Sequence, residues 1–319
     1  MPRIGDRGEM EAFVRAVELG GFSAAARDLK LSPSALSKLV DRLERSLDVQ
    51  LLRRTTRRLS LTAEGELFLA RCRRILMEFE DAETEVGRSR ERPRGKLHMH
   101  VGVGFAMHQL VPVLPAFMAR YPDVQLDLRI EDARLDLVNE GLDISVRPAP
   151  ADEAMVARTL FEFDRIVCVA PSYLNRFGTP RKPEDLREHR CLTVSGTFSA
   201  KRWSFHGPGG LLAIDIDGHA RVNNADAIYR LALDGQGIVH INEFICASAL
   251  RDGRLVPILA DYPCADGSQM LAMYPHERNR LPRVAAMLDF LGESFSGRPW
   301  RYAAAVPTRE GRGRQARKV

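Results

Sequence analysis

Apolar residues recur at intervals of three and four near the start of the chain, and this spacing predicts helices. The first helix ends at Gly20-Gly21, and its apolar positions are Met10, Phe13, Val14 and Val17. A second, short helix is expected from Ser23, as its N-cap, to about Leu29. A third has Ser32 as N-cap and Pro33 at its first position, and five apolar residues keep helical spacing along it, Leu36, Leu39, Val40, Leu43 and Leu47. The pattern therefore predicts a helix, a tight turn and a second helix in close succession.

The third helix has one apolar face and one face of short polar and basic side chains. The polar face holds Ser34, Ser37, Lys38, Asp41, Arg42 and Arg45. In a helix-turn-helix, the N-terminal residues of the second helix contact base edges in the major groove. We therefore expect base contacts from a group at that end of the helix, Ser32, Pro33, Ser34, Ser37, Lys38 and Arg42.

An arginine-rich segment follows this helix. Leu51-Leu52 and Leu59-Ser60-Leu61 are typical of two short strands around a basic tip, which together form a wing. Arginine contacts to phosphates set affinity and register without identifying the base. The expected phosphate-binding residues are Arg53, Arg54, Thr55, Thr56, Arg57 and Arg58. A solvated basic surface without DNA binding is the alternative.

A long helix without an internal breaker is predicted from Glu66 to Val86, with Thr62 as its N-cap. Its apolar positions step by four and three, which is the a and d spacing of a coiled coil, at Phe68, Cys72, Ile75, Phe79, Ala82 and Val86. We expect this seam to form a dimer that places two recognition helices across a two-fold axis. A single amphipathic helix packed on its own domain is the alternative.

The pattern changes after residues 87–95, a polar and basic stretch that contains Pro93 and is typical of a linker. Beyond it, strand-like and helix-like segments alternate, which predicts an α/β fold with parallel strands and crossover helices. The expected strands are 97–103, 124–130, 142–147, 165–170, 191–194, 238–241 and 270–274. The expected helices are 111–120, 135–140, 172–177, 224–233 and 282–295.

The amino-terminal pattern resembles the winged helix of LysR-type transcriptional regulators. The residues that carry the resemblance are Gly20–Ala26, Leu31–Lys38, Leu51–Arg57 and Leu61–Gly65. A looser resemblance continues to about Leu291 through Val111–Phe117, Tyr121–Val124, Gly141–Arg147 and Gly235–Ile238. It implies an effector-binding domain of the type 2 periplasmic-binding-protein kind, in which two α/β lobes are joined by two crossover strands and a ligand binds in the cleft.

The expected fold is thus multidomain: an all-α winged helix-turn-helix with a long linker helix, followed by a two-lobed α/β effector domain. We expect the DNA-binding domain at 1–66 and the linker or dimerisation helix at 62–90. The effector domain is expected at 91–297, with lobe 1 at about 95–162 and 267–297, and lobe 2 at about 163–266. The basic remainder, 298–319, has the composition of a disordered tail.

Ligands in open α/β lobes bind at the carboxyl ends of strands, where glycine turns expose backbone N–H groups. In lobe 1 the candidates are Gly102, Val103, Gly104, Phe105 and Arg147, the last of which could pair with a carboxylate. In lobe 2 they are Ser195, Gly196, Thr197 and Asn223. A plain strand-to-helix turn, a surface ion pair at Arg147 and a helix N-cap at 223–224 are the alternatives. His98 and His100 are expected to be hydrogen-bonded within the fold.

The net charge of +5 changes this picture little, because the excess positive charge sits at the two ends of the chain. The local arginine cluster, and not the overall charge, indicates nucleic acid. The five cysteines show no metal-binding spacing, which fits reduced thiols and no zinc site. No signal-peptide core and no run of the roughly 18 apolar residues that a membrane span needs is present. We expect a cytoplasmic protein.

No nucleophile elbow, zinc-protease motif, phosphate-binding loop or complete dinucleotide fingerprint occurs, so we expect no enzyme, no cofactor and no metal. The expected function is sequence-specific DNA binding and transcription regulation, modulated by a small-molecule effector between the lobes. The expected partners are double-stranded DNA, an effector that is a candidate anion, further copies in a homodimer or homotetramer, and RNA polymerase, but no membrane. A winged helix fused to a small-molecule enzyme and a solute-binding transport component are the alternatives.

Overall fold

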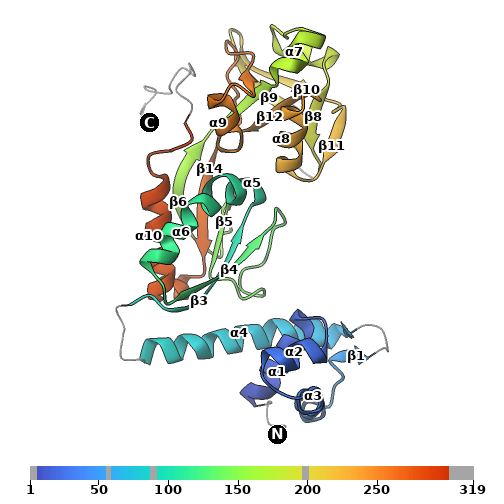
Figure 1. Cartoon of the computed structure of the whole chain (residues 1–319), viewed down its shortest axis with the longest axis vertical. Helices are drawn as coiled ribbons and strands as arrows, with labels where there is room; N and C mark the ends of the chain where they lie inside the picture. The colour runs from blue at the N-terminus through green and yellow to red at the C-terminus, as the bar shows by residue number, and fades with distance from the viewer. Residues whose placement is uncertain (1–5, 55–58, 87–91, 196–200, 302–319) are drawn as a thin grey trace, which may run out of the picture.

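The computed structural model describes residues 6–54, 59–86, 92–195 and 201–301 (Figure 1). An amino-terminal domain lies at one end of the long axis of the molecule, and two α/β lobes follow it along that axis. The long helix α4, Ala63–Val86, lies between the amino-terminal helices and the first lobe.

The amino-terminal domain is built from short helices and a two-stranded wing. Its elements are α1 (Arg7–Glu18), α2 (Phe22–Asp28), α3 (Pro33–Leu47), β1 (Leu52–Arg54) and β2 (Leu59–Leu61). Phe13 of α1 and Leu36, Val40 and Leu43 of α3 are buried together in its core, as the helical spacing predicts. The expected N-cap of α2 is wrong by two residues, because Gly21 and not Ser23 precedes the first helical residue.

The start of α4 is as the sequence predicts. Thr62 Oγ1 accepts a hydrogen bond from the backbone N–H of Gly65 at 2.9 Å, which makes Thr62 the cap of this helix. Gly65 is required here because a Cβ at this position would collide with the backbone carbonyl of Leu51. The helix therefore begins packed directly against the wing.

The predicted coiled-coil seam along α4 is wrong at its first two positions. Cys72 is fully buried, and Phe68 packs on Phe13 with ring centroids 6.0 Å apart, so both belong to the core of their own domain. Ile75, Phe79 and Ala82 remain exposed, whereas the side chain of Val86 lies outside the described residues. Periodicity alone does not tell an intramolecular apolar face from an intermolecular one.

Lobe 1 is a five-stranded sheet with helices on its faces. Its strands are β3 (Gly95–Val101), β4 (Val124–Ile130), β5 (Ile144–Pro148), β6 (Val156–Phe163) and β14 (Ser268–Tyr274), in the order β4-β3-β5-β14-β6. Its helical segments are α5 (Val103–Phe105), the π-turn η1 (Ala106–Leu110), α6 (Val111–Arg120), η4 (His276–Arg280) and α10 (Pro282–Phe295).

Lobe 2 contains a second five-stranded sheet, in the order β11-β8-β12-β7-β13, and a β9-β10 hairpin. Its strands are β7 (Arg165–Val169), β8 (Cys191–Val194), β9 (Arg202–Gly207), β10 (Gly210–Asp215), β11 (Ala220–Val222), β12 (Ile238–Asn242) and β13 (Val256–Pro257). Its helices are α7 (Pro171–Phe177), η2 (Pro183–Glu188), α8 (Ala225–Leu233) and α9 (Glu243–Arg251).

Two structural predictions for these lobes are wrong. The sheets are mixed, because β14 runs antiparallel to β5 and β6, and β7 runs antiparallel to β12. β14 returns from lobe 2, so it enters the lobe 1 sheet from the side that faces lobe 2. β7 comes directly from lobe 1, so it enters the lobe 2 sheet from the side that faces lobe 1. Residues 135–140 form a turn instead of a helix, since the Asp136 carboxylate accepts the N–H groups of Val138 and Asn139.

The two lobes share one apolar core. The chain passes to lobe 2 between β6 and β7, and an aromatic cluster fills the junction, Phe105, Phe161, Phe163, Phe244, Phe295 and Trp300. Trp300 is buried with its ring 4.5 Å from that of Phe161, so the tail expected to be disordered from residue 298 is ordered as far as Arg301. Residues 302–319 lie outside the described part of the chain. None of the described helices is long and apolar enough to cross a bilayer.

Candidate nucleic-acid interface and effector cleft

Helix α3 presents its polar N-terminal end to solvent. Ser32 caps it by accepting the N–H of Ala35 at 3.1 Å, and its hydroxyl lies 3.1 Å from that of Ser34. Ser32, Pro33, Ser34 and Lys38 are exposed, and Ser37 is half-buried. Leu36, Val40 and Leu43 are fully buried on the opposite face, so the core holds the exposed end of the helix in place.

Arg42 is placed differently from the other candidate DNA-contacting residues. It is exposed on α3, but its Nε lies 3.4 Å from the carboxylate of Glu9, which is the third residue of α1. Glu9 is almost buried and closes the capping box of its own helix with Asp6. The position of the Arg42 guanidinium is therefore set by α1.

A single carboxylate ties the wing to the recognition helix. Glu44 Oε1 accepts the backbone N–H groups of Leu51 at 2.8 Å and Leu52 at 3.0 Å, where the chain enters β1. In the hairpin, Arg53 pairs with Ser60, and the side chain of Arg53 is exposed. The side chain of Arg54 and all of Thr55, Thr56, Arg57 and Arg58 lie outside the described residues. Glu44 was not among the predicted site residues, because a contact between its carboxylate and backbone N–H groups leaves no pattern in the sequence.

The lobe 1 candidates for effector binding are largely occupied by contacts within the fold. Val103 follows Gly102, the N-cap of α5, and its N–H donates to Asp132 Oδ1 at 2.9 Å. Gly104 is buried, and a Cβ there would collide with Ile245 of lobe 2. A carboxylate of the protein thus already lies where the glycine turn was expected to hold a ligand anion.

The prediction that Phe105 contacts the effector is wrong, because its side chain is only 2% exposed and has no surface for a ligand. Its ring lies 5.0 Å from that of Phe295, 5.4 Å from that of Phe161 and 5.9 Å from that of Phe244. Aromatic rings at these separations stabilise a core beyond the area that they bury. Phe105 therefore joins lobe 1 to α9 of lobe 2.

Arg147 lies half-buried at the end of β5, beside a second cation. Burial lowers the pKa of its guanidinium from the usual value, and the positive charge of Arg134 acts in the same direction. Nearby, His100 is buried between Ser145 Oγ at 2.8 Å and the Glu131 carbonyl at 3.0 Å. His98 lies 3.1 Å from Asp127. Both histidines are hydrogen-bonded within the fold, as expected.

The lobe 2 candidates are only partly described. Ser195 is half-buried and donates its backbone N–H to the Val222 carbonyl at 2.8 Å, whereas Gly196 and Thr197 lie outside the described residues. Asn223 is exposed just after β11. Its neighbour Asn224 caps α8 by accepting the N–H of Ala227 at 3.0 Å. The alternative of a helix cap thus holds for Asn224.

Three contacts that the sequence did not indicate close the junction between the lobes. His108 Nε2 of η1 lies 2.8 Å from Asp226 Oδ1 of α8, and the His108 ring stands edge-on to that of Tyr229. Gln109 donates its amide to the Phe244 carbonyl at 2.6 Å. These partners are 118 and 135 residues apart in the chain, so no local pattern could reveal them.

Known proteins match both parts of the chain. Residues 8–66 match the bacterial regulatory helix-turn-helix family of LysR type, and residues 90–296 match the LysR substrate-binding domain. The transcriptional regulator CrgA of Neisseria meningitidis serogroup B is 35% identical over 288 residues, which are 90% of this chain and 96% of CrgA. This chain belongs to the LysR family of transcriptional regulators.

Two further matches extend over nearly all of this LysR-family chain. The transcriptional regulator PtxR of Pseudomonas aeruginosa is 33% identical over 293 residues, which cover 92% of this chain and 94% of PtxR. The solved structure of CrgA superposes with a TM-score of 0.61 at 35% identity, and it covers 89% of this chain and 97% of that one. The winged helix-turn-helix and the two-lobed α/β regulatory domain are therefore those of the family.

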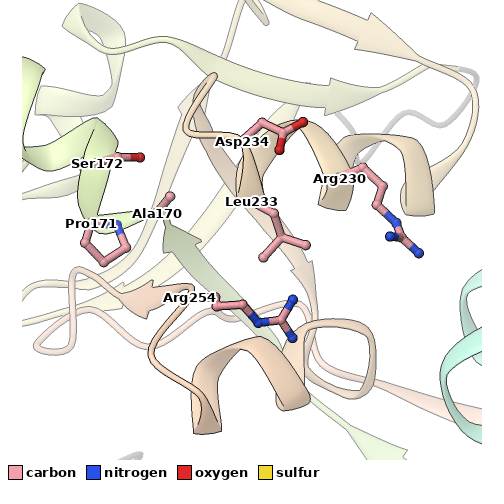
Figure 2. Close-up of a pocket in the computed structure, with 7 residues that line it drawn as sticks. All are labelled: Ala170, Pro171, Ser172, Arg230, Leu233, Asp234 and Arg254. Atoms are coloured by element: carbon pink, nitrogen blue, oxygen red, sulfur yellow. The ribbon is translucent and has the colours of Figure 1, made fainter.

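The LysR-type lobes also carry a surface pocket away from the candidate effector residues. It has a volume of about 570 Å³ and is lined by Ala170, Pro171, Ser172, Arg230, Leu233, Asp234 and Arg254 (Figure 2). Ala170 follows the end of β7 that points away from the crossover to lobe 1. The pocket thus lies at the outer end of lobe 2, opposite to Ser195.

A second cavity, of about 660 Å³, lies between the amino-terminal domain and lobe 1. Arg73 of α4 crosses this boundary and lies 3.4 Å from Glu18 of α1 and 3.3 Å from Glu140 of lobe 1. Arg129 also reaches Glu140, at 2.6 Å. Charged side chains thus join the DNA-binding domain of this LysR-type protein to the nearer lobe.

Proposed function

We propose that this LysR-family protein binds duplex DNA through the N-terminal end of α3 and the wing, and that a small anionic effector between the lobes modulates this binding. The observation that carries the proposal is the geometry of α3. Ser32, Ser34 and Lys38 project from a helix whose opposite face is locked in the core, and Glu44 fixes the wing beside it. Side chains arranged in this way supply base and phosphate contacts from one rigid body.

Self-association is the second part of the proposal. On α4, Leu67 is 75% exposed, Ile75 41% and Phe79 47%. A helix of this length with large apolar side chains in solvent is suited to packing against the same helix of another copy. The homodimer, or a homotetramer built from it, would present two copies of α3 to the two halves of an operator.

The effector-binding part rests on the lobe junction. The turn after β3 offers an N–H group at Val103, and Arg147 and Arg134 place two cations near the same end of the sheet. Asp132 accepts that N–H now, so a ligand carboxylate would replace it and change the contacts that hold the lobes together. A non-enzymatic role, a cytoplasmic location and contact with RNA polymerase belong to the same proposal.

Lys38→Ala tests the DNA interface in the full-length protein. We expect the affinity for the cognate promoter fragment to fall at least tenfold, and the preference over unrelated DNA to shrink, because an exposed cation at the groove is lost. Arg202→Ala, which removes an exposed arginine of the lobe 2 hairpin, is the matched control and should bind normally. Equal DNA affinities for Lys38→Ala, the control and the unmodified protein would refute the proposed role of α3.

A further inference from the structure

Three side chains with metal-binding atoms meet in lobe 2 beside the return crossover to lobe 1. They are His240 of β12, and Cys264 and Asp266 of the segment that leads into β14. One ligand atom of each, the His240 ring nitrogen, the Cys264 sulfur and an Asp266 oxygen, lies within 4.8 Å of the other two. The three residues come from positions with no spacing motif, so the sequence does not reveal them.

The nitrogen and oxygen ligand atoms of this cluster are buried without well-aligned hydrogen bonds to the residues that the structure describes. The His240 side chain is only 1% exposed, and its Nε2 finds no well-aligned hydrogen-bond partner among the described residues. Within the described part of the chain, both oxygens of Asp266 also lack a well-aligned hydrogen bond, although each is at ion-pair distance from a cationic or imidazole nitrogen: Oδ1 lies 3.2 Å from His240 Nε2, and Oδ2 lies 3.2 Å from Arg165 Nη1. Buried polar atoms are nearly always hydrogen-bonded with good geometry, so three poorly aligned atoms in one place favour a further ligand between them.

From this geometry we propose that His240, Cys264 and Asp266 bind a divalent transition metal, with Zn²⁺ as the expected ion. Imidazole, thiolate and carboxylate are together the donors that Zn²⁺ takes, whereas Mg²⁺ and Ca²⁺ require oxygen ligands. Three protein ligands leave a fourth tetrahedral position for water.

The surroundings of the cluster fit this role. Trp203 and Phe205 of β9 pack near the His240 ring, at centroid distances of 5.1 and 6.3 Å, and exclude water from it. Arg165 Nη1 lies 3.2 Å from Asp266 Oδ2, which orients the carboxylate and leaves Oδ1 towards His240. Such outer contacts fix ligand orientation in metal sites.

Metal binding by these three residues exchanges the thiol proton of Cys264 for the ion, because the thiolate is the form that binds a metal. Binding forms one sulfur–metal bond and releases that proton to solvent, with no change of oxidation state.

The bound metal would fasten the return crossover to lobe 2. Zn–N and Zn–O bonds of about 2.0–2.2 Å and a Zn–S bond of about 2.3 Å place tetrahedral ligand atoms about 3.4–3.6 Å apart. His240 Nε2 and Asp266 Oδ1 already lie 3.2 Å apart, so the adjustment is made mainly at the Cys264 sulfur, which lies within 4.8 Å of both. Cys264 and Asp266 lie four and two residues before Ser268, the first residue of β14 in lobe 1, so this movement is made in the segment that joins the lobes. The site therefore lies where a metal would bias the relative position of the lobes.

The test uses the full-length protein without a histidine tag, stripped with a chelator and kept reduced. Zn²⁺ binding is measured by equilibrium dialysis with elemental analysis, and Co²⁺ serves as an optical probe. We expect one metal ion per chain and a near-ultraviolet thiolate-to-cobalt absorption band. Cys264→Ser should abolish the band and weaken Zn²⁺ binding at least tenfold, and Asp266→Asn should weaken binding while retaining the band.

Cys191→Ser is the matched control, because Cys191 is buried in the same apolar cluster of lobe 2 but lies outside the trio. It should bind metal as the unmodified protein does, and circular dichroism checks that each variant is folded. A cobalt band of full strength in folded Cys264→Ser would overturn the proposal. The proposal would also be overturned if the unmodified protein bound less than one Zn²⁺ per chain and bound it no more tightly than Cys264→Ser does.

Discussion

The recognition surface of the amino-terminal domain and the junction between the lobes differ in whether their candidate binding groups already have partners within the protein. On α3, Ser34 and Lys38 project into solvent from a helix with a buried opposite face. At the junction, Val103 already donates to Asp132, and Gly104 abuts Ile245. The first surface is open to a large polyanion such as DNA, whereas a ligand at the second would have to replace contacts that the protein already makes.

This difference assigns rigidity and change to separate parts of the molecule. Under the proposed function, DNA binding would require no rearrangement within the amino-terminal domain, because the candidate contacting side chains are exposed and their backbone is held by the core. Under the proposed function, an effector at the junction would compete with the Asp132 carboxylate and move elements that meet across the lobes. A ligand shifts a conformational equilibrium only by its difference in affinity for the two states, and in the proposed function that difference would arise at the junction.

Replacement of Phe105 gives the largest effect expected from this contrast. Because its ring contacts Phe161, Phe244 and Phe295 inside the shared core, Phe105→Ala should lower the free energy of unfolding of the effector domain by about 3–5 kcal/mol. Denaturant unfolding monitored by tryptophan fluorescence measures this. Phe177→Ala, at an exposed position on α7, is the control and should cost about 1 kcal/mol or less. A stable Phe105→Ala variant with an altered ligand response would restore Phe105 as a ligand contact.

Removal of the Glu44 carboxylate tests whether the recognition surface is preassembled. Glu44→Ala deletes the acceptor of two backbone N–H groups and should destabilise the amino-terminal domain by about 2–3 kcal/mol. Promoter affinity should fall several-fold as the wing loses its position. Thermal unfolding and a DNA-binding titration measure the two effects. Glu78→Ala is the control: it also removes one glutamate, from an exposed ion pair with Arg74, and should change neither the stability nor the promoter affinity. Equal behaviour of the Glu44 and Glu78 variants would contradict the role of Glu44.

The two regions also differ in what their sequences disclose. The core of α3 follows from local helical spacing, and the bounds of β4 and α10 are those that the sequence predicts, Val124–Ile130 and Pro282–Phe295. In each case one face of one element is buried in its own neighbourhood, so the pattern along a few turns contains the information. The family resemblance then supplies the two-lobed arrangement.

The junction could not be derived in this way, because its partners are distant in the chain. Phe105 follows a glycine turn, which is typical of a ligand loop, yet the rings that bury it come from β6, α9 and α10. In the sequence, Asp226 is one acid in the first turn of a helix, and nothing indicates its contact with His108 of the other lobe. The roles of the remaining candidate DNA and effector residues stay predictions.

Asp132→Ala would sharpen the contrast from the side of the lobes. Loss of this carboxylate frees the Val103 N–H and removes a negative charge, so a small carboxylate should bind about tenfold more tightly, a gain of about 1.4 kcal/mol. A thermal-shift titration with benzoate and with succinate measures it. Asp127→Ala, at an exposed position of the same lobe, is the control. If both variants bind benzoate and succinate with the affinity of the unmodified protein, Asp132 does not occupy the position of a ligand carboxylate.

The smallest effect is a pH dependence that only the buried part of the molecule should show. Burial lowers the pKa of His100 from 6.5, so between that value and its folded pKa the unfolded chain binds more protons than the folded one. Stability is therefore lost as the pH falls through about 6.5, and His100→Asn should flatten the melting-temperature profile between about pH 7.5 and 5.5 by roughly 1–3 °C.

His206→Asn, at an exposed position, should leave the profile unchanged. His240, which is also buried with a lowered pKa, keeps part of the slope in the His100 variant, so the expected result is a reduced slope. An identical slope in His100→Asn and the unmodified protein would show that the hydrogen bonds to Ser145 and Glu131 tolerate the charged imidazole.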